Sequence, residues 1–303
     1  MEEIMTKGFV TIATGKEQYY KIARNLLRSY RYTTKSPFPF AILCEEENEY
    51  TKEFDVVNVY PKATRSYLDK IEMFDLLPFD INIFIDADCL CFRDINRLFD
   101  IFETTGDFCC YGRVLPLDDK TGWFEYDNLN ADLQKQIDYV VGLHGGIYYM
   151  RKTQKCRSVF ETAKKFTENY SEYKFKGNFD SPGDEPVVAL SMAVNKCKPI
   201  SFNQHSIDCY WEHENKFNLD IKNSIATPKD IGENYDIVHW GTRFTNSIPY
   251  KKVMVDLEAN IDCKKTYTIT IKDYWEEVNM YLKRISSIPK RAIRKIKRML
   301  SNT

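Results

Sequence analysis

The sequence predicts an α/β protein with a mostly parallel sheet that is flanked by helices on both faces. Short apolar runs of strand length alternate with segments whose hydrophobic residues recur at helical spacing, through the first third of the 303-residue chain. This alternation is typical of parallel strands that are joined by crossover helices. The chain is 43% hydrophobic, enough for a large core, and its net charge of −1 argues against a nucleic-acid partner.

The first strands and helices are predicted from apolar runs and their spacing. Three runs of strand length occupy residues 8–14, 40–45 and 55–60. A helix should follow the first strand, with an apolar stripe formed by Ala23, Leu26, Leu27 and Tyr30. A second helix should end before Pro78, with an apolar stripe formed by Tyr67, Ile71, Phe74 and Leu77. A fourth strand, 81–86, comes directly after it.

Further elements are predicted in the remainder of the chain. A short helix over 94–100 should be capped by Asp94, and 107–113 and 145–151 should be strands. The polar segment between these strands, 114–138, is long for a loop inside a domain. The other predicted elements are helices over 152–170, 184–194 and 271–286, and a short strand over 235–241.

The fourth predicted strand ends in a pair of carboxylates, Asp86 and Asp88, at the edge of the sheet where ligands of α/β proteins gather. On an extended segment, side chains two residues apart point to the same side, so the two charges would repel each other. A hard divalent cation such as Mn²⁺ or Mg²⁺ would remove this repulsion, because both ions accept carboxylate ligands. A solvated turn is the alternative interpretation of the same pattern.

Residues 81–99 (INIFIDADCLCFRDINRLF) resemble the Asp-x-Asp segment of GT-A-fold glycosyltransferases, especially the glycogenin and lipopolysaccharide-galactosyltransferase type (glycosyltransferase family 8). Five further segments resemble that family in the expected order, at 9–30, 65–80, 142–152, 183–193 and 237–242. The resemblance covers roughly residues 8 to 245. It implies the GT-A fold, in which a mostly parallel Rossmann-like sheet is flanked by helices.

The resemblance also implies an activity and its cofactors. In that family a divalent ion, Mn²⁺ or Mg²⁺, assists transfer of a sugar from a nucleotide donor, most often a UDP-sugar, to a glycan or lipid-linked acceptor. The residues implied to hold the ion are Asp86, Asp88 and His239. The residues implied to contact the donor are Ala13, Thr14, Tyr19, Lys70, Asp86, Ala87, Asp88, His144, Gly145, Gly146 and Gly241. The implied reaction is hexosyl or pentosyl transfer, with retention of configuration favoured over inversion.

The chain departs from the family pattern at three places, one of which is the closing segment HWGT (239–242): it lacks the usual Lys-Pro-Trp tail, whose lysine Lys251 or Lys252 could supply. His144 stands where Asn or Asp is expected before the glycine pair, and Asp184 with Glu185 replaces the usual Asp-Gln-Asp. Asp184 and Glu185 are the implied catalytic residues, which would bind sugar hydroxyls or act as a base. Because they begin a predicted helix, stabilisation of that helix N-terminus is the alternative role.

The end of the chain differs in composition from the rest. Residues 1–265 are predicted to form the glycosyltransferase domain, and 266–303 a helical extension with a basic amphipathic tail. Residues 283–298 contain eight Lys or Arg and no acid. Apolar residues at helical spacing would let residues 288–300 lie on an anionic membrane surface. Docking of the tail on its own domain and nucleic-acid binding are the competing interpretations.

Cysteine usage and the N-terminal sequence predict a cytoplasmic protein that is at most peripheral on the cytoplasmic face of a membrane. The nine cysteines are odd in number and show no Cys-x-x-Cys spacing, so we expect reduced thiols and neither disulfides nor a zinc site. The sequence shows no signal peptide and no apolar run long enough to span a bilayer. It carries no signal for a particular oligomeric state.

Two other classes of function fit parts of the pattern. A metal-dependent nucleotidyltransferase or phosphodiesterase could use a similar sheet, but a nucleotidyltransferase usually has a glycine-rich, arginine-containing loop after its first strand. The corresponding segment here, ATGKEQYY, has a single glycine. A non-catalytic nucleotide-sugar-binding relative is the third class, and it would bind UDP without Mn²⁺ dependence and without turnover.

Overall fold

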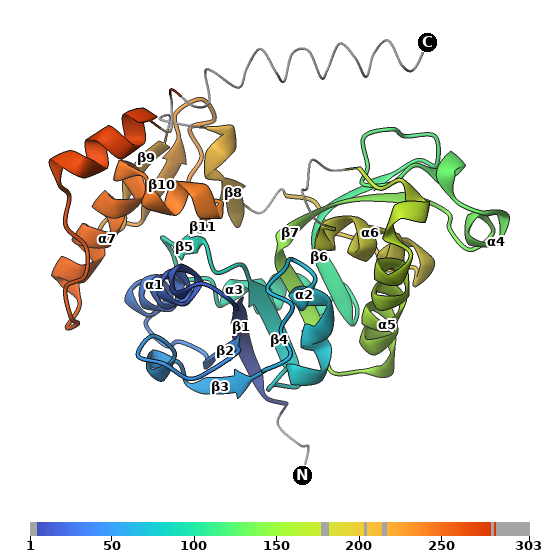
Figure 1. Cartoon of the computed structure of the whole chain (residues 1–303), viewed down its shortest axis with the longest axis horizontal. Helices are drawn as coiled ribbons and strands as arrows, with labels where there is room; N and C mark the ends of the chain where they lie inside the picture. Colours follow the sequence, from blue (N-terminus) through green and yellow to red (C-terminus); the bar gives the residue numbers. More distant parts are fainter. Residues whose placement is uncertain (1–4, 177–181, 203–204, 214–216, 280–281, 283–303) are drawn as a thin grey trace.

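The structure is a computed structural model that describes residues 5–176, 182–202, 205–213, 217–279 and 282. At its centre is a six-stranded sheet with the order β3-β2-β1-β4-β7-β6 (Figure 1). The strands are β1 (Lys7–Ala13), β2 (Phe40–Cys44), β3 (Val56–Val59), β4 (Ile81–Ile85), β6 (Phe108–Leu115) and β7 (Val140–Arg151). Neighbouring strands among β1 to β4 pair in parallel, whereas β7 runs antiparallel to both β4 and β6. The predicted mostly parallel α/β sheet is therefore confirmed.

Helices cover both faces of this sheet, because its central strands β2 and β4 are buried at every position and mostly apolar. Along β1, Phe9 packs into the core under α1 (Glu17–Thr33) and α3 (Arg97–Glu103). The next residue, Val10, packs into the opposite core, under α2 (Asp69–Glu72), α5 (Gln154–Glu168) and α6 (Asp184–Val194). Consecutive side chains of a strand point to opposite faces, so one apolar run supplies both cores.

A smaller sheet with the order β5-β11-β8 stands beside the carboxyl end of β4. Its strands are β5 (Cys89–Cys91), β8 (Ile207–Cys209) and β11 (Ile237–His239). β11 pairs antiparallel with β5 and parallel with β8, so His239 lies opposite Cys89 on one side and Cys209 on the other. The hairpin of β9 (Phe217–Asp220) and β10 (Ile225–Pro228) and helix α7 (Ile248–Asn260) share a third core with Leu90 and Trp240.

The remaining helical segments are short. They are α4 (Ala131–Gln134) and the 3₁₀ helices Thr51–Glu53, Met73–Leu76, Tyr126–Asn128, Tyr170–Tyr173, Tyr210–Glu212 and Thr242–Asn246. Residues 271–279 are also helical, and the predicted tail from 283 onward lies outside the described residues.

Three local predictions are wrong. Tyr67 precedes α2 and is 55% exposed, because that helix begins only at Asp69. The helix predicted over 94–100 begins at Arg97, and Asp94 instead accepts a hydrogen bond from the Asn96 N–H. The segment after β4 is a turn and not an extended strand, since the Cys89 N–H donates to the Asp86 carbonyl at 3.0 Å.

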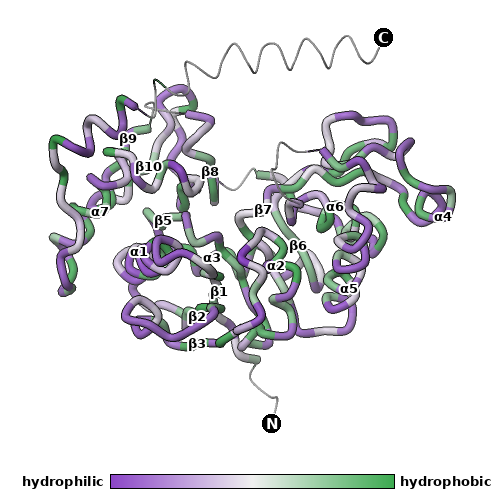
Figure 2. The backbone as a smooth tube through the Cα atoms, viewed as in Figure 1, coloured by the Kyte–Doolittle hydropathy of each residue, from purple (hydrophilic) through white to green (hydrophobic). Residues whose placement is uncertain are grey.

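Hydrophobic residues follow the central strands, and the outer loops are mostly hydrophilic (Figure 2). The nine cysteines are free thiols, as expected. Among the described helices, none combines the length and the apolar composition that crossing a membrane requires.

Candidate active site

The pairing of β5 with β11 brings Asp86, Asp88 and His239 together. The turn after β4 ends at Asp88, which β5 follows directly. Because His239 lies opposite Cys89, the Trp240 N–H reaches the Asp88 carbonyl and donates to it at 3.0 Å. The backbone therefore fixes the imidazole next to both carboxylates.

The side chains of this group are in contact. His239 Nε2 lies 3.0 Å from Asp88 Oδ1 and 3.7 Å from Asp86 Oδ2. Thr242 Oγ1 donates to the other Asp88 oxygen, Oδ2, at 3.1 Å. Asp86, Asp88 and His239 thus lie together at the carboxyl end of β4. These are the residues that the resemblance implies as metal ligands.

Lys70 supplies a buried positive charge on the other side of Asp86. Its Nζ lies 2.8 Å and 3.0 Å from the two Asp86 oxygens and 3.2 Å from Asp184 Oδ2. The ammonium also donates to the Gly145 carbonyl at 3.4 Å. Helix α2 therefore carries a cation to the point where β4, β7 and α6 meet.

The pKa values of the group reflect this arrangement. Burial, together with repulsion from Asp88 and Asp184, raises the pKa of Asp86 more than Lys70 and His239 lower it. Burial also acts on Asp88, but the charge and hydrogen bond of His239, together with the charge of Lys70 and the hydrogen bond from Thr242, outweigh it and hold the pKa of Asp88 below its usual range. Burial lowers the pKa of His239, but the charge and hydrogen bond of Asp88 and the charge of Asp86 together raise it by more, so the pKa of His239 lies above its usual value.

Asp184 and Glu185 open α6 and face the same site. Their side chains do not cap α6, whose N-cap is Gly183. Asp184 Oδ2 accepts a hydrogen bond from the Tyr148 hydroxyl at 3.0 Å, and Glu185 Oε1 accepts one from the Gly145 N–H at 2.7 Å. Burial, followed by repulsion from Asp184, raises the pKa of Glu185 to about 7.

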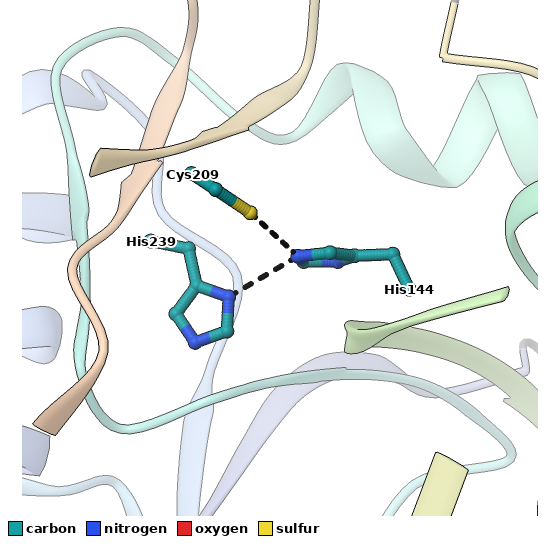
Figure 3. Close-up of side chains that lie close together, drawn as sticks. All are labelled: His144, Cys209 and His239. Carbon is teal, nitrogen blue, oxygen red and sulfur yellow. Dashed lines mark hydrogen bonds between the residues drawn. The ribbon is translucent and has the colours of Figure 1, made fainter. Parts of the chain in front are cut away.

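Strand β7 places His144 and the two glycines against this group. His144 Nε2 lies 3.2 Å from His239 Nδ1 and 3.2 Å from Cys209 Sγ (Figure 3). Burial, and then the charge of His239, lower the pKa of His144 to about 3. A Cβ on Gly146 would lie 2.6 Å from the His144 ring and 3.0 Å from His239 Nδ1, so only glycine permits this approach.

The resemblance implies that Ala13, Thr14, Tyr19 and Gly241 contact the nucleotide sugar. In the structure these four residues contact other parts of the protein. Ala13 is buried at the end of β1, and Tyr19 packs half-buried against the core under α1. Thr14 Oγ1 donates to Asp69 Oδ2 at 2.8 Å, which ties the end of β1 to the start of α2. Gly241 has a φ of +69°, and a Cβ there would meet the Trp211 ring at 3.1 Å. This glycine lets the chain turn sharply after His239.

Four residues of the site were not predicted from the sequence. Tyr148 holds Asp184, Thr242 holds Asp88, and Cys209 contacts His144. Burial and the nearby Tyr19, Asp88 and Asp184 raise the pKa of Tyr67, which borders the site. Thr242 lies within 237–242, one of the segments that resemble the family, so the sequence could have indicated it. No motif in the sequence around Cys209 points to the site.

The donor set suits a divalent cation at Asp88 and His239. Neighbouring ligands about 2.1 Å from one ion lie about 3 Å apart, close to the 3.0 Å between Asp88 Oδ1 and His239 Nε2. Carboxylate and imidazole together suit Mn²⁺ better than Mg²⁺. Within the described ranges, Asp88, Cys89 and His239 form a possible metal-binding group in which Asp86 is not included. Asp86 is held by Lys70 and would have to rotate to become a direct ligand.

We predict that Lys70→Met destabilises the protein strongly. The side chain keeps its length but loses its charge, which leaves Asp86 and Asp184 without their shared cation. The free energy of unfolding, measured by urea denaturation, should fall by about 3 to 5 kcal/mol. As a control, Lys164→Met removes the half-exposed pair with Glu72 and should cost less than about 1 kcal/mol. Similar small losses in both variants would contradict this role of Lys70.

We predict that Glu185→Gln changes how stability depends on pH. The folded-state pKa of about 7 lies above the ordinary glutamate pKa of 4.5, so the stability that protonated Glu185 provides is lost as pH rises from about 4.5 to 7. Glutamine keeps the acceptor for the Gly145 N–H and does not titrate. Relative to wild type, the variant should gain up to about 3 kcal/mol of unfolding free energy between pH 4 and pH 8. Parallel stability curves would refute the raised pKa, and Glu161→Gln on the exposed face of α5 is the control.

No protein-family model and no curated protein matches the chain by sequence. Solved structures match its fold at 10–12% sequence identity. An active-site mutant of LgtC matches with a TM-score of 0.56 over 89% of this chain and 99% of that chain, at 10% identity. The galactosyltransferase LgtC in complex with donor and acceptor sugar analogues matches with a TM-score of 0.52 over 85% and 97%, at 10% identity.

A third solved structure shares the fold. The apo form of WbbM, a bifunctional glycosyltransferase, matches with a TM-score of 0.54 at 12% identity. The match covers 86% of this chain and 51% of that one, so this chain corresponds to about half of WbbM. The fold that the sequence resemblance implies is confirmed, and the chain has the GT-A fold seen in these glycosyltransferases.

Proposed function

We propose that the protein is a metal-dependent glycosyltransferase that moves a sugar from a nucleotide donor to a hydroxyl of a glycan or lipid-linked acceptor. The observation that carries the proposal is the contact of Asp88 with His239, beside the Lys70–Asp86 pair, at the carboxyl end of β4. Ligands of α/β sheets bind at this edge. A metal centre at this place in a GT-A fold suits chemistry in which a diphosphate leaves.

The chemical need follows from the bond that breaks. Cleavage of the anomeric C–O bond leaves a nucleoside diphosphate with extra negative charge, and a bound Mn²⁺ or Mg²⁺ would neutralise that charge. Asp88 and His239 hold the ion in this proposal, and Asp86 lies in its outer shell near the ribose. Lys70 keeps Asp86 and Asp184 in place and adds positive charge near the phosphates.

We propose a UDP-sugar as the donor, with a hexosyl or pentosyl group transferred. Two observations support retention of configuration. Asp184 is bound to Lys70 and Tyr148, and Glu185 is bound to the Gly145 N–H. Because both carboxylates are engaged, neither is free in the way that a base in an inverting transfer must be. In this proposal they bind sugar hydroxyls at the start of α6.

Hydrolysis of nucleotide sugars without acceptor tests the function. Wild-type protein should hydrolyse at least one UDP-sugar in a panel, and only with Mn²⁺ or Mg²⁺ present. Asp88→Asn keeps the size of the side chain and should lower this rate by about 100-fold or more, with UDP binding in Mn²⁺ weakened in calorimetry. Asp118→Asn, an acid in the 114–138 loop, is the control. Equal turnover in wild type and Asp88→Asn would reject the metal assignment.

We further propose that the protein binds to an anionic membrane surface and meets its acceptor there. Residues 271–279 are helical, and Ile271, Trp275 and Val278 follow one another at helical spacing, with exposed fractions of 79%, 65% and 46%. Leu282 is also exposed, at 55%. The basic composition of 283–298 continues directly from it. An apolar face that carries a Trp beside a basic segment is typical of helices that lie in the lipid interface.

Vesicle binding tests this membrane proposal. A double variant, Ile271→Ser with Trp275→Ser, should bind vesicles containing anionic lipid at least about tenfold more weakly, measured by co-sedimentation. Its hydrolysis of a soluble UDP-sugar should not change. The matched control, Val59→Ser with Val114→Ser, replaces two apolar residues that are 44% and 45% exposed elsewhere. Equal binding by the two double variants would reject a role for this helix face.

A further inference from the structure

A second group of ligand-type atoms lies on the far side of the His239 ring. His144 Nε2 is 3.2 Å from Cys209 Sγ and 3.2 Å from His239 Nδ1. Cys209 Sγ and His239 Nδ1 are both directed at His144 Nε2, as Figure 3 shows, and the ligand atoms of the three side chains all lie within 4.8 Å of one another. His239 therefore directs Nε2 toward Asp88 and Nδ1 toward His144 and Cys209.

The fold builds this cluster from three strands. The parallel pairing of β8 with β11 sets Cys209 directly beside His239. His144 comes from β7 of the large sheet, and Gly146 leaves room for the two imidazoles to approach. The cluster thus joins the two sheets, and no two of its members are neighbours in the sequence.

Apolar and aromatic groups shield the cluster from water. Cys209 and His239 are 7% and 8% exposed. The Trp211 ring packs edge-on against His239 with 4.8 Å between ring centroids, and Phe202 packs against His144 at 5.8 Å. A shielded surrounding strengthens the bond between a cation and a thiolate or imidazole ligand.

The donor set differs in chemistry from that at Asp88. Two imidazoles and one thiolate suit Zn²⁺ and other softer transition-metal ions, whereas carboxylates suit Mn²⁺ and Mg²⁺. In a tetrahedral zinc site, Zn–N distances of about 2.0–2.1 Å and a Zn–S distance of about 2.3 Å set neighbouring ligands about 3.3 to 3.6 Å apart. The two contacts of 3.2 Å to His144 need to open by a few tenths of an ångström, and the remaining pair, Cys209 with His239, lies within 4.8 Å. Ligation through Nε2 also moves the ring proton of His144 to Nδ1, which gives up the hydrogen bond it accepts from the Gly146 N–H at 3.2 Å.

We propose that His144, Cys209 and His239 form a zinc site with three protein ligands and one open position, next to the Asp88–His239 site. The two sites share the His239 ring, one through Nδ1 and the other through Nε2, and because a neutral imidazole has one free lone pair, both ions bind at once only when the ring is the imidazolate. The sequence expectation of no zinc site rested on the missing Cys-x-x-Cys spacing. That spacing describes ligands on one loop, and a site assembled from three strands leaves no such signal.

The test is direct titration of the metal-free full-length chain with Zn²⁺ against a competing chelator. Wild type should bind one equivalent, and X-ray absorption should show one sulfur among the ligands. Cys209→Ser and His144→Asn should each weaken binding by about 100-fold or more and remove the sulfur or one imidazole from the spectrum. Replacement of Zn²⁺ by Co²⁺ should give a thiolate-to-cobalt charge-transfer band that Cys209→Ser abolishes.

Two further variants make the outcome decisive. Cys263→Ser removes a cysteine outside the cluster and should bind Zn²⁺ like wild type. Asp88→Asn should retain the sulfur ligand in the spectrum and weaken zinc binding by at most about 100-fold, because Asp88 contacts only the Nε2 side of His239. The proposal is overturned if Cys209→Ser, with an unchanged unfolding transition, binds Zn²⁺ as tightly as wild type. Loss of zinc in Asp88→Asn alone would assign the ion to the carboxylate side and also overturn it.

Discussion

The structure depends on the balance of charge around Asp86 and Asp88. Two carboxylates at the end of a buried strand are costly without cations nearby. Lys70 binds Asp86 from one side and His239 binds Asp88 from the other. These two contacts draw α2 and β11 to the same point, and Asp184 then joins through Lys70. The site is therefore also a junction at which α2, β4, β11 and α6 meet.

Much of the fold could be predicted from the sequence, because the core strands are buried on both faces. Strands of this kind are continuous apolar runs, and β1, β2 and β4 appear as such. The helix α6 was also predicted with its observed bounds, since it is apolar nearly all round after two acids. The turn signal Pro78 correctly separated α2 from β4. The carboxylate pair, which is visible in the amino-acid sequence alone, marked the edge of the sheet where the candidate site lies.

The remainder depends on tertiary pairing that leaves little local pattern. β5, β8 and β11 are three residues each, too short for periodicity to identify reliably. Their pairing decides which residue faces Asp88, and it brings Cys209 to His144 as well. The orientation of Asp86 and Asp88 is set by the turn after β4 and by the contact of Asp86 with Lys70. The extended geometry expected for this pair was therefore wrong, although both carboxylates do face His239. Such contacts follow from register, which a single sequence does not display.

The length of chain between Asp88 and its partners has a consequence for biosynthesis. Thr242 and Asp88 are 154 residues apart, so this contact closes a very large loop. During translation the four parallel strands emerge first and can associate while the segment that carries His239 is still in the ribosome. Until β11 pairs with β5, Asp86 and Asp88 have no imidazole beside them. In the proposed metal site the histidine ligand therefore arrives late, and an incomplete nascent chain with a finished sheet would still lack it.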